Sequence, residues 1–349
     1  MMQLGTRRLA LPLIQGGMGV GISLGNLAGS VAKEGGMGVI STANIGFREG
    51  DFWQNAKQAN SRALAAEIAK AKAIAHGAGL VAINAMVATA DYANAVKTAV
   101  SAGVDAIISG AGLPMELPML ADGADVLLAP IVSSGRAASV ICRSWQMHYQ
   151  RLPNFVVLEG SEAGGHLGFS RKELDDGSAK PLSVLLADVL NAVAAFGKIP
   201  VFVAGGISDG AQICHYINEG AAGAQIATRF IATEECDASD GYKEVFLHAE
   251  SSDICLVNSP VGMPGRALFT PLVKKLAQRE TFPPTQCVNC LVPCNPAKTP
   301  YCITRALIEA AKGNFEEGLF FCGAHAGGAK KLVTVKTLID ELMQPWREL

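Results

Sequence analysis

A histidine set among glycines is the first candidate for chemistry in this sequence. His166 lies in the run Glu-Gly-Ser-Glu-Ala-Gly-Gly-His-Leu-Gly over residues 159–168. An imidazole has an ordinary pKa close to neutrality, so one that faces a cavity can transfer a proton. Glu162 either orients this ring or is an ordinary exposed carboxylate. The run predicts proton transfer at His166, with a solvated loop histidine as the alternative.

Glycine-rich turns form a second group of candidates. Gln-Gly-Gly-Met-Gly occupies residues 15–19, Ala-Gly-Gly-Ile occupies 204–207, and Gln-Ile-Ala-Thr-Arg occupies 225–229. Glycines let a flat ligand approach the backbone, and unpaired N–H groups in such turns bind phosphate. The alternative is that these glycines serve only turns and close packing. Asn84, after another apolar run, adds an amide that is either a ligand group or a turn former.

Four cysteines cluster near the C-terminus in the pattern C-x2-C-x3-C-x7-C. They are Cys287, Cys290, Cys294 and Cys302, out of nine cysteines in the chain. Four thiolates at short spacing can hold zinc or an iron–sulfur cluster, although this spacing matches neither a ferredoxin nor a zinc ribbon. Buried or redox-active free thiols are the alternative. A metal site at these cysteines is therefore one of two open predictions.

Positioning these groups requires a scaffold, and the sequence predicts one with repeated βα units. Short apolar runs alternate with amphipathic stretches, as in a parallel sheet buried on both faces. Eight such units favour a (β/α)8 TIM barrel over an open doubly wound sheet, and they place the glycines and His166 at the carboxyl ends of strands. The expected strands are 11–15, 38–41, 80–84, 106–109, 126–129, 155–158, 201–204 and 224–227, and the clearest helices are 61–76, 91–102, 136–149, 182–196 and 209–219.

The barrel accounts for only the first part of the 349 residues. We expect it to end near residue 250, after a long loop at 159–180 that could cover a substrate. Residues 251–349 then form a C-terminal extension that carries the cysteine cluster and an amphipathic stretch at 333–343. This extension is expected to pack on the barrel.

Composition excludes several classes of protein. Hydrophobic residues make up 50% of the chain and charged residues 17%, which indicates a well-packed globular protein. The formal net charge of −2 gives no general attraction to nucleic acid. The long uncharged run 9–32 contains a proline and six glycines, so it is a poor membrane span. We expect a cytoplasmic protein without nucleic-acid or membrane partners.

Several of these runs, together, resemble the nitronate monooxygenase (2-nitropropane dioxygenase) family. The similarity rests on residues 13–19, the stretch Pro-Ile-Val-Ser-Ser-Gly-Arg-Ala-Ala at 130–138, the Glu-Ala-Gly-Gly-His-x-Gly motif at 162–168, and residues 204–207 and 227–230. That family includes flavin-dependent enoyl-acyl-carrier-protein reductases and related quinone reductases. The resemblance covers residues 4–270 and implies a TIM barrel that binds FMN without a covalent bond.

The resemblance also implies roles for individual residues. His166 would be the catalytic acid or base, at the substrate side of the flavin. The implied FMN-binding residues are Gly17, Met18, Gly19, Asn84, Gly164, Gly165, Ala204, Gly205, Gly206, Gln225, Ala227 and Thr228.

Two activities follow from the resemblance, and they differ in the electron donor. The first is oxidation of alkyl nitronates with O2, and the alternative is an NAD(P)H-dependent enoyl-acyl-carrier-protein or quinone reductase at the same FMN site. A protein that holds FMN without turning over a small substrate is a third reading. In the enzyme readings we expect a small-molecule substrate, with a homodimer left open.

Overall fold

Eight parallel strands close into a barrel in the order β10-β11-β3-β4-β5-β6-β7-β8. The computed structural model describes residues 2–348. The barrel and its eight predicted strands are thus confirmed, and no strand boundary differs from its predicted position by more than three residues. The strands are β3 (Leu13–Gln15), β4 (Met37–Ser41), β5 (Leu80–Met86), β6 (Ala106–Gly110), β7 (Leu127–Val132), β8 (Val156–Glu159), β10 (Val201–Ala204) and β11 (Gly223–Ile226).

Side chains of each barrel strand alternate between two buried layers. In β10, Val201 and Val203 pack toward the helices, whereas Phe202 and Ala204 pack inside the barrel. Successive residues of a strand point to opposite faces, so a strand that is buried on both faces must be apolar throughout. This explains why the strands appear in the sequence as short unbroken apolar runs.

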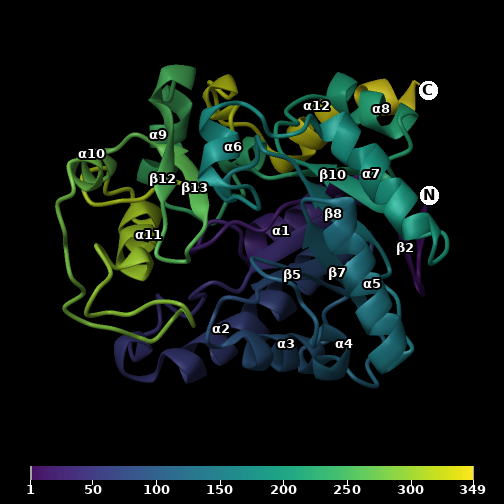
Figure 1. Cartoon of the computed structure of the whole chain (residues 1–349), viewed down its shortest axis with the longest axis horizontal. Coiled ribbons are helices and arrows are strands. Elements are labelled where there is room, and N and C mark those ends of the chain that lie inside the picture. Colours follow the sequence, from purple (N-terminus) through teal and green to yellow (C-terminus); the bar gives the residue numbers. More distant parts are fainter. Residues whose placement is uncertain (1, 349) are drawn as a thin grey trace.

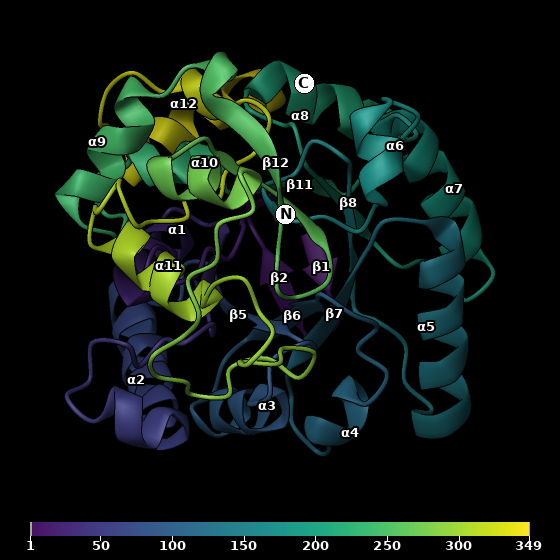
Figure 2. The ribbon, with the colours of Figure 1, turned by 60° about the vertical axis from the view of Figure 1, so that its left-hand side comes forward.

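Helices surround the strands (Figure 2). The ring ends with the last helix of the chain, α12, which packs against both α8 and α1. Gly210 permits this contact, because a Cβ at that position would lie 2.6 Å from the Leu342 carbonyl oxygen. The extension predicted at 251–349 therefore contributes one helix to the barrel's outer layer. The ring is α1 (Gly25–Lys33), α2 (Phe52–Ala75), α3 (Tyr92–Ser101), α4 (Leu117–Leu120), α5 (Gly135–Tyr149), α7 (Leu182–Ala194), α8 (Gly210–Asn218) and α12 (Val335–Arg347).

A short hairpin at the N-terminus packs against the inside of the barrel. Its strands β1 (Met2–Leu4) and β2 (Arg7–Leu9) pair antiparallel. Leu4 and Leu9 are fully buried with the interior residues Phe155 and Phe202. The hairpin therefore supplies apolar side chains to the barrel interior, which is a packed core and not a pore.

Between β11 and α12 the chain leaves the ring and gathers to one side, drawn in green to yellow in Figure 1. A three-stranded antiparallel sheet, in the order β12-β13-β9, joins this part to the loop that carries His166. The elements are β9 (Gly165–His166), η1 (Thr228–Ala232), α9 (Asp240–His248), η2 (Ser251–Asp253), β12 (Ile254–Asn258), β13 (Pro264–Leu268), α10 (Pro271–Ala277), α11 (Ile303–Ala311) and η3 (Ala326–Gly328); the loop after β8 also contains α6 (Arg171–Asp175).

None of the helices in residues 2–348 combines the length and the apolar character needed to cross a bilayer.

Candidate functional site

A cavity of about 230 Å³ lies among the carboxyl ends of the barrel strands. Active sites of TIM barrels lie at this end, because the βα loops converge there. Every residue that the sequence analysis assigned to catalysis or to the cofactor lines this cavity; these are Gly17, Met18, Gly19, Asn84, Gly164, Gly165, His166, Ala204, Gly205, Gly206, Gln225, Ala227 and Thr228. We refer to it below as the cofactor cavity.

The glycine turn after β3 is held by buried polar groups. Gln15 is fully buried, and its Oε1 accepts a hydrogen bond of 3.0 Å from the Val39 amide. The Met18 amide donates to the Ser23 hydroxyl at 2.7 Å, and the Met18 carbonyl accepts from the Ser23 amide at 3.0 Å. At Gly17 a Cβ would lie only 2.5 Å from the Asn84 Cβ. The turn is therefore rigid, and only glycine fits beside Asn84.

The turn after β10 provides backbone donors for an anion. Gly205 and Gly206 have φ values of +93° and +82°, a region that side chains other than glycine rarely adopt. Within residues 2–348, the amides of these two glycines donate to no other protein atom. Two neighbouring N–H groups without protein acceptors, in a glycine turn at the end of a barrel strand, are typical of a phosphate site.

An arginine that the sequence analysis did not assign lies at the same end of the cofactor cavity. Arg229 donates to the Ser208 carbonyl and forms a 2.9 Å ion pair with Glu341 of α12. Its Nε is buried without a hydrogen-bond partner. A buried donor without a partner is costly, so this guanidinium favours an anion beside the glycine turn.

His166 is held from the C-terminal side. It lies in β9, opposite Gly265 of β13, and its Nε2 is 2.7 Å from the Ser259 hydroxyl. The ring also contacts the edge of Phe321, with 5.0 Å between ring centroids. Burial lowers the pKa of His166 to about 4, so the ring is neutral at pH 7.

Glu162, which was one open candidate for orienting His166, bonds elsewhere. Its Oε2 lies 3.1 Å from Nε2 of His325, and its backbone carbonyl accepts from the Ala324 amide. Ser259 occupies the position next to the imidazole instead. The carboxylate therefore joins two loops at the edge of the cofactor cavity.

Glu159 is a second titratable group in the cavity, at the last position of β8. Burial raises the pKa of its carboxyl group to about 8. The carboxyl group is therefore mostly protonated at pH 7, when the nearby imidazole is neutral. A carboxylic acid can donate a hydrogen bond, whereas a carboxylate can only accept one. The sequence placed this residue at a strand end but gave no sign of its burial.

The C-terminal part contributes more of the cavity wall than the sequence predicted. Residues 321–325 line it, and the Gly323 amide donates to the Thr228 hydroxyl at 3.0 Å. Arg266 of β13 donates to the carbonyls of Ser161 and Ala163, which fixes the loop before His166. Such contacts between distant segments leave no local signal in a sequence.

The four clustered cysteines lie in the irregular segment between α10 and α11. Cys287 is exposed and the other three are half-buried. No group of three or more His, Cys, Asp or Glu side chains in the described chain is arranged to hold a metal ion. Burial raises the pKa of Cys290, and the other three thiols lie near enough to raise it further. The choice between a metal site and free thiols therefore stays a prediction.

Comparison with known proteins identifies the family. The family model for nitronate monooxygenase matches residues 4–345. The chain belongs to the nitronate monooxygenase family. It thereby belongs to a family of oxidoreductase enzymes, as the sequence analysis expected.

Two curated relatives illustrate the range of the family. A 5-hydroxy-7a-methyl-1-oxo-octahydro-1H-indene-4-carboxyl-CoA dehydrogenase of Mycobacterium tuberculosis is 28% identical over 265 residues, which cover 76% of this chain and 65% of the relative. A nitronate monooxygenase of Pseudomonas aeruginosa is 28% identical over 197 residues, which cover 54% of this chain and 50% of the relative. The chain thus spans less than two-thirds of the length of either relative.

Solved structures extend the likeness over nearly the whole chain. FabK from Thermotoga maritima superposes with a TM-score of 0.75 at 25% identity, covering 97% of this chain and 94% of FabK. A nitroalkane oxidase from Streptomyces ansochromogenes gives a TM-score of 0.73 at 21% identity, covering 97% of this chain and 98% of the oxidase, and it supports the fold alone.

Proposed function

We propose that this chain is an FMN-dependent oxidoreductase that oxidises alkyl nitronates with O2. The observation that carries the proposal is the cofactor cavity itself. It combines glycine turns, two unpaired backbone amides and an arginine with a neutral histidine at its border. Family membership supports the same assignment.

The residues present fit FMN. A flat ring needs close approach to the backbone, and Gly16, Gly17 and Gly19 line the cavity without side chains that would hinder it. A phosphate needs donors, which Gly205, Gly206 and the unpartnered Nε of Arg229 offer. The residues assigned to hold FMN in this proposal are Gly17, Met18, Gly19, Asn84, Gly164, Gly165, Ala204, Gly205, Gly206, Gln225, Ala227 and Thr228.

The mechanism assigns proton transfer to His166. Bound FMN would supply the two-electron chemistry that side chains lack. His166 is neutral at pH 7 because burial lowers its pKa to about 4, so it can accept the acidic proton next to the nitro group of a neutral nitroalkane and form the nitronate that is then oxidised. In the tautomer that donates from Nε2 to the Ser259 hydroxyl, Nδ1 is the nitrogen that takes the proton. The loops around the cavity hold the imidazole of His166 in one orientation and limit access of water to it.

A reductase that uses NAD(P)H is the second candidate. The likeness to FabK over nearly the whole chain and to a CoA-thioester dehydrogenase favours it. In this case a proton must be donated, and Glu159 is better suited than His166 because its raised pKa keeps it protonated at pH 7. The two candidates therefore differ in which residue moves the proton.

Anaerobic mixing separates these functions. The flavin absorbance of the holoprotein is followed after addition of propyl-1-nitronate, NADH or NADPH. We expect the nitronate alone to bleach the flavin. Bleaching only by a nicotinamide would establish the reductase instead, and bleaching by none would favour a protein that holds FMN without turnover. Purified protein that neither contains FMN nor takes it up would overturn all three.

The cysteine cluster remains a separate proposal, with a metal or iron–sulfur site as one alternative and free thiols as the other. A cluster there could relay electrons and would favour the reductase. Analysis of iron, sulfide and zinc in protein purified without air decides between them, since absence of all three removes the metal site.

A further inference from the structure

A second cavity, also of about 230 Å³, adjoins the cofactor cavity at His166. The two share four lining residues, which are Ala43, Met86, His166 and Leu307. His166 thus lies between a cavity that fits FMN and a space on its other side. A substrate that reacts at the histidine could extend into this second cavity, which we call the side cavity.

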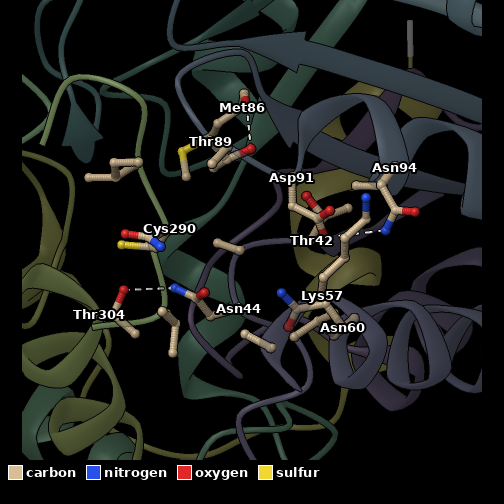
Figure 3. A pocket seen from close by; sticks show the side chains of 18 of the residues that line it. Thr42, Asn44, Lys57, Asn60, Met86, Thr89, Asp91, Asn94, Cys290 and Thr304 are labelled. Atoms are coloured by element: carbon tan, nitrogen blue, oxygen red, sulfur yellow. Dashed lines mark hydrogen bonds between the residues drawn. The ribbon is translucent and has the colours of Figure 1, made fainter. Parts of the chain in front are cut away.

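The walls of the side cavity are fixed by hydrogen bonds between distant segments (Figure 3). Asn44, in the loop after β4, donates to the Thr304 hydroxyl of α11 at 3.0 Å. Asn94 of α3 donates to the Ser61 hydroxyl of α2 at 2.8 Å. A backbone hydrogen bond also joins two segments of the wall, from the Ala90 amide to the Cys290 carbonyl at 3.1 Å. The cavity therefore has a defined shape before any ligand binds.

Asp91 lines this cavity, and its carboxylate is short of hydrogen-bond partners. It precedes α3, where an aspartate normally accepts a backbone N–H of the first turn, but its side chain makes no such bond. Its Oδ1 is buried without a hydrogen-bond partner, and its Oδ2 accepts only a long bond of 3.4 Å from Asn94. A buried acceptor in this state favours a ligand that carries a donor.

Lys57 lines the same cavity from α2 with the opposite charge. Burial raises the pKa of Asp91, and the Lys57 ammonium is near enough to oppose that shift, yet no ion pair within 4.0 Å joins the two side chains in the described chain. A singly charged group in this cavity would meet one attraction and one repulsion, because Asp91 repels an anion and Lys57 repels a cation. A neutral group that both donates and accepts suits both charges, and a hydroxyl or an amide is such a group.

Polar side chains such as Asn60 and Asn289 also line the side cavity, and apolar residues form a large part of the remaining wall. The apolar residues include Ile45 and Leu64 on the barrel side and Val261, Ile303 and Leu307 on the C-terminal side. These side chains suit a hydrocarbon chain and offer it no hydrogen bonds. A ligand that fits the whole cavity therefore has an apolar linker and a polar neutral end.

We propose that the side cavity selects substrates that carry a hydroxyl or amide group at a fixed distance from the reacting carbon, with Asp91 as the acceptor of its hydrogen. This inference rests on the proposed function for the reacting end of the substrate. It adds a specificity-determining pair, Asp91 and Lys57, that takes no part in proton transfer at His166.

The test compares matched substrates that differ by one hydroxyl. The holoenzyme is assayed with the nitronates of ω-nitro alcohols of three to six carbons and with those of the nitroalkanes of the same length. At the best length, we expect kcat/KM for the alcohol to exceed that for the alkane about tenfold, the value of one net hydrogen bond. In Asp91→Ala this ratio falls to about one, and Lys57→Ala lowers it in the same direction.

Two controls and one second variant keep the result interpretable. Asp122→Ala and Lys97→Ala remove exposed charges outside the side cavity, so both retain the wild-type ratio. Asp91→Asn keeps the shape and an acceptor oxygen, so its ratio lies between the wild type and Asp91→Ala even if the alanine variant folds poorly. A wild-type ratio near one at every length, with turnover present, overturns the inference.

Binding measurements separate this inference from the proposed function. Calorimetric titration of the anaerobic holoprotein with the neutral nitro alcohol and nitroalkane needs no turnover. If nitronates are not oxidised but the alcohol binds about tenfold more tightly, and Asp91→Ala removes that difference, the proposed function fails and the inference stands. If neither turnover nor binding distinguishes the two compounds, the inference is wrong.

Discussion

The two cavities that meet at His166 differ in the parts of the chain that line them. Nine of the residues that line the cofactor cavity are glycines, most of them in turns at the ends of barrel strands, whereas no glycine lines the side cavity. The side cavity is lined by side chains of α2, α3, α11 and the irregular segment before α11. A backbone lining suits a ligand that is the same in every member of a family, whereas side chains can change one at a time. This difference agrees with our proposals that the first cavity holds the cofactor and that the second selects the substrate.

The strongest way to test this division is to remove the imidazole that lies between the cavities. With a neutral nitroalkane as substrate, we expect His166→Ala to retain FMN and to lose roughly 100- to 10,000-fold in kcat/KM, the usual range for a general base. Flavin absorbance gives the FMN content and oxygen consumption gives the rate. His148→Ala removes an exposed histidine of α5 and should match the wild type. Undiminished turnover in His166→Ala would remove this residue from the mechanism.

The cofactor cavity can be disturbed separately through Gly206. This residue has a φ of +82°, and a Cβ there would collide with the carboxylate of Glu162. We expect Gly206→Ala to weaken FMN binding about a hundredfold, because backbone strain of roughly 1–2 kcal/mol adds to the displacement of Glu162. Fluorescence titration of the apoprotein with FMN measures this change.

Gly177→Ala is the matched control for this substitution. Gly177 has a φ of +68° but nothing within 4 Å of its Cβ position, and it lies outside the cofactor cavity. It carries similar backbone strain without the collision, so FMN should bind as in the wild type. Equal FMN affinities in the two variants would show that a side chain at residue 206 does not disturb FMN binding.

The cofactor cavity could be predicted from the sequence because its signals are local. Each strand is a short apolar run, and each glycine turn follows its strand directly, so the barrel alone brings Gly17, Gly205 and Thr228 together. Ser259 lies 93 residues from His166, and only the pairing of β13 with β9 brings them close. The sequence has no local pattern that reports such a pairing.

The side cavity left no sequence signal for a related reason. The helix expected at 61–76 begins at Phe52, and its first half contains Lys57 and Asn60. These side chains face a cavity and not the core, so the apolar periodicity that predicts a helix is weak there. For the final helix the opposite part could be predicted. Its amphipathic pattern at 333–343 indicated a helix, but nothing in the sequence indicated that this helix packs beside α1 and α8.

Glu159 and His166 predict how stability depends on pH. Burial raises the pKa of Glu159 to about 8. The contribution of this group to the free energy of unfolding is therefore complete below its unfolded pKa of 4.5 and is lost as pH rises through 8. Burial lowers the pKa of His166 to about 4, so its contribution is present above 6.5 and is lost as pH falls through 4. Between pH 4.5 and 6.5 the two effects oppose each other.

Of these two groups, only Glu159 still changes its protonation above pH 6.5. We expect the free energy of unfolding of the apoprotein to fall by about 2 kcal/mol between pH 6.5 and 8, at 1.36 kcal/mol per pKa unit. Glu159→Gln, which cannot ionise, should lose most of that dependence. Urea unfolding at the two pH values measures both proteins. The same slope in the variant would mean that another group titrates.

The smallest effect concerns the contact that connects His166 to the C-terminal part. Ser259→Ala removes the hydroxyl 2.7 Å from Nε2 while leaving the imidazole and the glycine turns in place. We expect kcat to fall up to about tenfold, the value of one net hydrogen bond, with FMN affinity unchanged. Ser259→Thr, which keeps the hydroxyl, should restore most of the rate. If the threonine and alanine variants lose equal activity, Ser259 contributes packing at this position and does not orient the histidine.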